Sequence, residues 1–246
     1  MLIVVDGTWS MNFNSNDNGE DPSGRAIGNS DQNIRSNSRR FFEESRYPPN
    51  KKLYFVGPGN GMSGNDSYQI YFNVLRAIEQ EINEGNCDEL SFVGWSRGAA
   101  IIGELTEGLS ALSESNTRRD PQRTARGTRM RTVRNVLSRP MPPIKFVGLF
   151  DSVSMIWRSS PLNRQWGEQI TSAVQYFAHV TAGDRTGPVG GLIDFRMRNP
   201  DVGAARSEHL HLAQATHGDV GGDDTGQHAR TAYEYIRNHA NIAGCL

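Results

Sequence analysis

A G-x-S-x-G pentapeptide near the middle of the chain constrains the fold more than any other feature. It spans residues 94–98, with an apolar run at 90–93 before it and small residues at 98–100 after it. Glycines on both sides of a serine suit a sharp turn from a strand into a helix, because they leave room where the two elements crowd together. Such a turn would expose the hydroxyl of Ser96, and the backbone N–H of Arg97 would be one oxyanion donor. Alone, the pattern also fits an ordinary glycine-rich turn.

The length, charge and cysteine content of the chain limit the class of protein to which it can belong. With 246 residues it can bury one sizeable core, and we expect a single domain over residues 1–246. The net charge of −1 gives no global field that favours nucleic acid or membranes. Two cysteines, Cys87 and Cys245, are too few for a disulfide framework. The first apolar run is too short for a signal peptide, and no run is long enough to span a membrane. We therefore expect a protein that is cytoplasmic as synthesised.

The order of apolar runs predicts the fold class. Short β-branched or apolar runs at residues 2–5, 52–56, 90–93 and 144–150 predict strands buried on both faces. Helical spacing at 67–83, and after the pentapeptide to about 112, alternates with these strands. We also expect a short helix near 33–45, strands near 174–181 and 209–216, and a closing helix at 227–239. This order predicts an α/β fold, α/β-hydrolase-like, with a mostly parallel central sheet flanked by helices.

Three segments stand apart from this pattern. Residues 10–34 are rich in Asn, Ser, Gly and Asp and predict a long polar loop. Residues 113–143 form an Arg-rich insertion, with eight arginines and one acidic residue between 118 and 139. We interpret it either as a solvated surface segment or as a site for phosphate, from a lipid headgroup or a nucleic acid. No aromatic side chains interleave with the arginines, so a single-strand stacking platform is not expected. Residues 157–174 form either a lid over a site or part of the core.

Polar side chains at strand ends suggest a catalytic constellation. Asp151 follows the strand at 144–150, and His217 follows the strand at 209–216 beside several glycines. Because parallel strands present ligand and catalytic groups at their carboxyl ends, these residues are placed to meet Ser96. Ser96, Asp151 and His217 also occur in the chain order of α/β-hydrolases, as nucleophile, orienting acid and general base.

Metal binding is the alternative to the catalytic interpretation of these polar residues. His209 and His211 share one strand face, but no clear third ligand accompanies them. Asp219, Asp223 and Asp224 lack the spacing of a calcium loop. We expect neither a metal nor a cofactor.

Five blocks of sequence carry a family resemblance. They are V-D-G-T-W at 5–9, the Gly-rich stretch at 54–61, G-W-S-R-G-A at 94–99, F-V-G-L-F-D-S-V at 146–153 and H-G-D-V-G-G at 217–222. In these blocks the chain resembles the catalytic domain of type VI secretion lipase effectors, in family order over nearly the whole chain. The combination is far more specific than G-x-S-x-G alone. The family's H-A-L-A-x-D-E-R stretch is replaced here by His179-Val-Thr-Ala-Gly-Asp184-Arg185.

The resemblance implies an α/β-hydrolase fold and an esterase, commonly phospholipase, activity. It places the nucleophile on Ser96, the base on His217 and the acid on Asp151, with the D-G-T loop beside the site. We infer a second oxyanion donor in that loop, at Gly7 or Thr8. The further residues that we expect to line the site are Asp6, Trp9, Trp95 and Asp219.

The predicted function is therefore a serine hydrolase that cleaves carboxylic esters, above all a lipase or phospholipase. The expected partners are an ester or phospholipid substrate and an anionic membrane contacted through residues 118–139. Delivery of the protein by a secretion system would agree with the resemblance. Nucleic acid is the less expected partner. Two alternatives stay open: a hydrolase of soluble small esters or thioesters, and a non-catalytic module that binds nucleic acid or anionic lipid through the Arg-rich segment.

Overall fold

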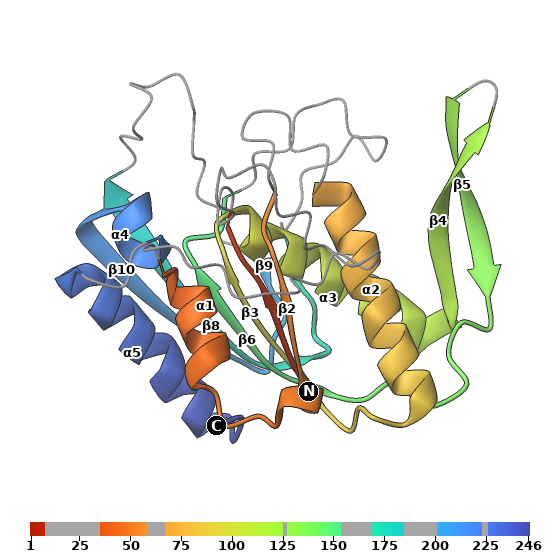
Figure 1. Ribbon diagram of the computed structural model, residues 1–246, viewed down its shortest axis with the longest axis horizontal. Helices are drawn as coiled ribbons and strands as arrows, with labels where there is room; N and C mark the ends of the chain where they lie inside the picture. The colour runs from red at the N-terminus through yellow and green to blue at the C-terminus, as the bar shows by residue number, and fades with distance from the viewer. Residues whose placement is uncertain (8–34, 59–66, 125–126, 154–168, 185–200, 223–225) are drawn as a thin grey trace.

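A six-stranded sheet forms the centre of the molecule. The computed structural model describes residues 1–7, 35–58, 67–124, 127–153, 169–184, 201–222 and 226–246. The strand order is β10-β8-β6-β3-β1-β2, and every neighbouring pair is parallel (Figure 1). The strands are β1 (Leu2–Val5), β2 (Lys52–Phe55), β3 (Leu90–Trp95), β6 (Ile144–Phe150), β8 (Val174–Asp184) and β10 (Arg206–Thr216). The predicted α/β fold is confirmed.

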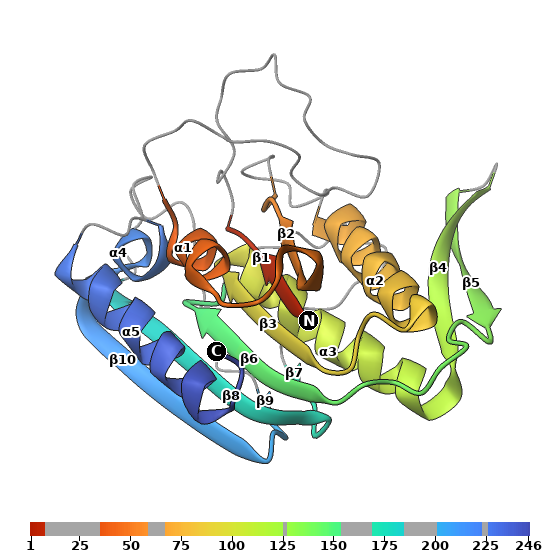
Figure 2. The same ribbon diagram turned by 60° about the horizontal axis from the view of Figure 1, so that its bottom comes forward.

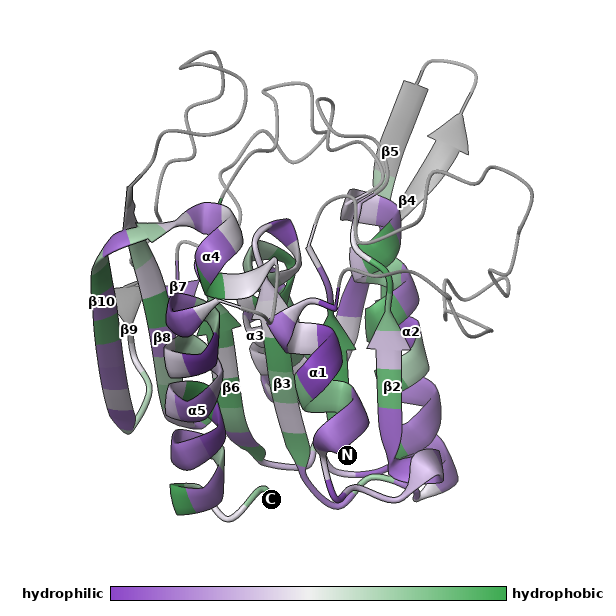
Figure 3. Cartoon of the chain, turned by 60° about the vertical axis from the view of Figure 1, so that its left-hand side comes forward, coloured by the Kyte–Doolittle hydropathy of each residue, from purple (hydrophilic) through white to green (hydrophobic). Residues whose placement is uncertain are grey.

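Helices cover both faces of the sheet. One face carries α2 (Ser67–Glu84) and α3 (Arg97–Ser115), and the other carries α1 (Asn37–Glu44), α4 (His217–Gly221) and α5 (Gln227–Ile242) (Figures 1 and 2). A short 3₁₀ helix (Pro49–Lys51) precedes β2. Alternate residues of β1 enter the two cores, because successive side chains of a strand point to opposite faces. Ile3 and Val5 lie in one cluster, and Leu2 and Val4 lie in the other. Figure 3 shows the hydrophobic central strands behind the mixed surface of α5.

The chain reverses direction across the sheet next to β1. It runs from β1 to the edge strand β2, and then returns to β3 on the other side of β1. Where the strand order reverses in this way, the loops at the carboxyl ends diverge and leave room for a ligand. Gly7 follows β1 and Ser96 follows β3, so the fold places these two residues at the reversal point.

The Arg-rich segment forms a hairpin that the sequence did not predict. Strands β4 (Thr117–Thr124) and β5 (Gly127–Arg134) pair antiparallel and project beside α2 (Figures 1 and 2). Arg118 braces the hairpin by pairing with Glu79 of α2 and with Asp120, whose Oδ1 lies 2.5 Å from Arg118 Nε.

Two other expected segments lie wholly or partly outside the described residues. The polar loop at 10–34 lies outside them, as do residues 157–168 of the expected lid. The described remainder of that lid forms β7 (Gln169–Ile170), paired with β9 (Asp201–Val202), and the start of β8. Within the described ranges, no helix combines the length and the apolar character needed to cross a bilayer.

Candidate active site

Ser96 occupies a strained turn between β3 and α3. Its φ of 58° and ψ of −126° lie in a region that L-residues rarely adopt, at a cost of about 1–3 kcal/mol. The turn also requires close packing. A Cβ on Gly98 would lie 2.3 Å from the carbonyl oxygen of Asp6, and a Cβ on Gly94 would lie 2.5 Å from Ile102 Cδ1 and 3.0 Å from the backbone N and Cα of Ala99. Both glycines of the pentapeptide are therefore needed for space, as the sequence predicted.

One imidazole joins the serine to a buried carboxylate. His217 Nε2 lies 2.8 Å from Ser96 Oγ, and His217 Nδ1 lies 2.6 Å from Asp151 Oδ2. A carboxylate at Nδ1 favours the tautomer that carries the proton there, which leaves the Nε2 lone pair facing the serine hydroxyl. The side chain of Asp151 is fully buried, whereas that of His217 is 14% exposed. The structure thus brings together the three residues that the sequence singled out.

Asp151 is held rigidly by the neighbouring strand β8. Its φ of 39° is one of four positive values among the described non-glycine residues, and Ser96 has another. The Asp151 N–H donates to the carbonyl of Val180 at 2.7 Å, and its Oδ1 accepts from the N–H of Ala182 at 3.0 Å. These two bonds fix the carboxylate so that Oδ2 faces His217.

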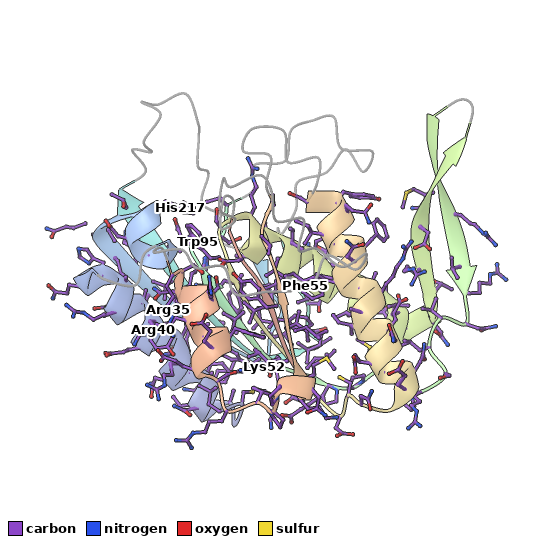
Figure 4. The ribbon with its side chains drawn as sticks, in the orientation of Figure 1. Arg35, Arg40, Lys52, Phe55, Trp95 and His217 are labelled. Carbon is purple, nitrogen blue, oxygen red and sulfur yellow. The ribbon has the colours of Figure 1, made fainter. Side chains whose placement is uncertain are left out.

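Trp95 packs against the imidazole ring of His217. The indole stacks on the imidazole with centroids 5.6 Å apart and planes at 27°. Three glycines make space for it: added Cβ atoms on Gly7, Gly221 and Gly222 would lie 2.2, 2.1 and 2.9 Å from atoms of the indole. Figure 4 shows Trp95 and His217 together near the carboxyl ends of the strands. The G-G pair of the H-G-D-V-G-G block therefore leaves the space that the indole occupies.

The backbone around Ser96 could bind a developing oxyanion. Arg97 is the first residue of α3, and the first N–H groups of a helix have no acceptor within the helix. The positive end of the helix dipole favours negative charge there. The N–H of Gly7 already donates to its neighbour's side chain, Asp6 Oδ1, at 2.8 Å. Thr8 and Trp9, also predicted at this site, lie outside the described residues.

The two remaining predicted residues, Asp6 and Asp219, hold the backbone next to the site. Asp6 is buried, 1% exposed, and accepts hydrogen bonds from Ser36, Ser38 and Tyr54. Sequence reasoning missed these three donors, although S-x-S before a helix is an N-cap signal. Asp219 is exposed and forms a capping box with Thr216, which fixes the start of the helix that carries His217.

The competing histidine pair has other partners. His211 Nδ1 lies 3.0 Å from Thr181 Oγ1, and His209 packs against the ring of Phe177. Burial lowers the pKa of His209. Across the part of the chain that the structure describes, no group of three or more His, Cys, Asp or Glu side chains could hold a metal ion.

Comparison with known proteins gives structural relatives only. No protein-family model matches the chain, and no curated protein has a significantly similar sequence. An uncharacterized protein from Pseudomonas aeruginosa is similar in structure, with a TM-score of 0.51 and 15% identity over 99% of this chain and 46% of that one. The Tle1 effector bound to the VgrG spike of the type 6 secretion system aligns with a TM-score of 0.47 and 15% identity, over 90% of this chain and 51% of that one. The chain thus spans about half the length of both structures, and the first likeness shows a shared fold.

Proposed function

We propose that the protein is a serine esterase that cleaves carboxylic esters through an acyl-enzyme, with phospholipids as its substrate class. The observation that carries the proposal is the position of His217, whose two ring nitrogens face Ser96 Oγ at 2.8 Å and Asp151 Oδ2 at 2.6 Å. A serine needs both an adjacent base and a group that orients that base to become a nucleophile. The blocks that resemble type VI secretion lipase effectors include all three residues.

The reaction follows from this geometry. His217 Nε2 takes the proton of Ser96 as Oγ attacks the ester carbonyl, and Asp151 stabilises the imidazolium that forms. The N–H of Arg97 stabilises the oxyanion. His217 then protonates the leaving alcohol. Water attacks the acyl-enzyme in the same manner and releases the acid, which restores Ser96.

The hairpin supports an anionic phospholipid as substrate. Arg119, Arg131 and Arg134 are exposed, and none of them pairs with an acidic group among the described residues. The hairpin rises toward the side on which the strands end and His217 lies (Figures 1 and 4). An anionic bilayer offers phosphates to these arginines and carboxylic esters to Ser96. A nucleic acid offers phosphates but no carboxylic ester.

Labelling with a fluorophosphonate tests the chemistry. We expect one adduct on the wild type by intact mass, and none on Ser96→Ala or His217→Ala variants that fold normally. No adduct on the folded wild type would refute the esterase.

Hydrolysis of phospholipid vesicles then tests the substrate class. We expect faster hydrolysis when anionic lipid is added to neutral vesicles, and loss of that gain when Arg119, Arg131 and Arg134 are changed to Gln. Hydrolysis of p-nitrophenyl butyrate without hydrolysis of either vesicle would instead identify a soluble-ester hydrolase. Salt-sensitive DNA binding that persists in Ser96→Ala, without any hydrolysis, would identify a binding module.

A further inference from the structure

The part of β8 that begins at His179 stands where the resembled family has H-A-L-A-x-D-E-R. Two of its backbone groups bind the acid of the candidate triad. The Val180 carbonyl accepts from the Asp151 N–H, and the Ala182 N–H donates to Asp151 Oδ1. The side chain of His179 adds a third bond, because its Nε2 accepts from the N–H of Ser152 at 3.2 Å. This segment of β8 therefore binds the two residues that follow β6 through both its backbone and a side chain.

The imidazole of His179 lies in the core and not at the surface. It is fully buried, and its centroid lies 5.9 Å from the ring of Phe177 and 6.0 Å from that of His209. Phe177 packs in the cluster that α2 and α3 cover, and His179 points to the same face because it is two residues further along the strand. His217 begins α4, a helix on the other face. Because it is fully buried, His179 can act on the site only through other residues.

The bond to Ser152 requires a neutral imidazole. A ring nitrogen that accepts from an N–H carries no proton, so the proton of the neutral ring is on Nδ1. Ser152 is only 1% exposed, and a buried backbone donor that loses its acceptor is costly. His179 therefore supplies an acceptor that this backbone N–H needs.

Three consecutive backbone N–H groups hold the turn that follows β6. The N–H of Asp151 donates to the backbone of β8, that of Ser152 to His179, and that of Val153 to the Ser96 carbonyl at 3.3 Å. The φ of Asp151, 39°, is a strained value that persists only where the surrounding contacts determine it. Of the three acceptors, only the imidazole belongs to a side chain. A substitution can therefore remove it while the backbone acceptors remain.

We infer that His179 is a positioning residue for ester cleavage: it holds the turn after β6 so that the carboxylate of Asp151 stays in line with His217. The inference rests on the proposed function. It gives a role to a buried histidine that takes no part in the proton transfers. A residue that acts through the triad acid should change turnover and leave substrate binding nearly unchanged.

The test compares two substitutions of His179. His179→Phe keeps a ring but offers no acceptor, whereas the amide oxygen of His179→Gln can accept in place of Nε2. With p-nitrophenyl butyrate, we expect His179→Phe to lower kcat about 10–100-fold with KM within about twofold. His179→Gln should keep kcat within about threefold of the wild type, because the acceptor is restored. His209→Phe is the matched control, with the same change on the neighbouring strand, and should leave kcat unchanged.

Two further readouts separate positioning from a general structural effect. In an Asp151→Asn background, His179→Phe should lower kcat by at most about twofold, because the carboxylate that it positions is already absent. The second readout is the low-field proton NMR resonance of His217 Nδ1–H, whose nitrogen lies 2.6 Å from Asp151 Oδ2. A charge-assisted hydrogen bond this short depends on alignment. The resonance should be kept in His179→Gln and lost or moved upfield in His179→Phe.

Three results would overturn the inference. They are wild-type kcat in a folded His179→Phe variant, an equal loss of kcat with and without the Asp151 carboxylate, and an unchanged His217 resonance. If His179→Phe does not fold, His179→Asn decides by the same criteria, because its side chain is too short to replace Nε2. Phosphonate labelling of the wild type separates the two failures. A labelled wild type with unaffected variants rejects only the role of His179, whereas an unlabelled wild type rejects the esterase itself.

Discussion

Replacing Gly221 by Ala tests whether the position of His217 depends on the space that Gly221 leaves for the indole of Trp95. The added Cβ would lie 2.1 Å from Trp95 Cδ1, whereas ordinary contact begins at 3.4 Å, so 1.3 Å of overlap must be relieved. The indole cannot retreat freely, because it also stacks on His217 and lies against Gly7 and Gly222. Overpacking of this kind costs about 1–3 kcal/mol, and each kcal/mol lowers the melting temperature of a chain this long by about 2–4 °C. Displacing the imidazole by about 1 Å should slow phosphonate labelling roughly 10²-fold.

Gly218→Ala is the matched control in the same helix. Gly218 is exposed, and the nearest atom to an added Cβ is Thr216 Oγ1 at 3.9 Å. This variant should be as stable as the wild type or more stable by up to about 1 kcal/mol, with unchanged labelling. In a Trp95→Ala background the cost of Gly221→Ala should largely disappear, because the overlapping ring is gone. Equal costs of Gly221→Ala in the two backgrounds, measured by thermal unfolding, would refute the reasoning.

Three further predictions concern the acid, the hairpin and pH. Asp151→Asn should lower kcat roughly 10⁴-fold, because an amide favours the wrong imidazole tautomer, and a variant that keeps a tenth of the ester hydrolysis rate would contradict this role. Arg118→Met leaves Glu79 buried without its partner and should lower the free energy of unfolding, measured in urea, by about 3–5 kcal/mol. Adding Glu79→Gln to this variant should restore much of the loss. Burial lowers the pKa of His239, so the folded state binds fewer protons than the unfolded one. The neutral His239 therefore contributes stability above about pH 6.5, and this contribution is lost as the pH falls through the folded pKa. The free energy of unfolding should depend less on pH between about 7.5 and 5 in His239→Gln than in the wild type. An equal dependence in the two proteins would refute this prediction.

Short-range sequence signals predicted the sheet and the candidate triad residues well. The apolar runs, the spacing of helices and the polar residues at strand ends are local patterns, and parallel strands bring their carboxyl ends together wherever they lie in the sequence. The contacts around Trp95 and Asp6 are different, because they join segments that no local pattern relates. Nothing in the sequence near Gly221 indicates an indole from β3, and nothing near Ser38 indicates a carboxylate from β1. The hairpin was missed because its arginines and Pro121 hide the alternation that normally marks a strand.

The position of His217 beyond β10 has a consequence for how activity is lost. Among the described strands, β10 pairs only with β8, and its register with that strand shifts between Leu212 and Thr216, just before the histidine. An edge strand with one partner opens at a lower free energy than the whole sheet. Hydrogen exchange in β10 should therefore be faster than in β3. As the denaturant concentration rises, the reactivity of Ser96 should be lost before the aromatic core unfolds. Loss of activity would then measure the local opening of the single strand β10.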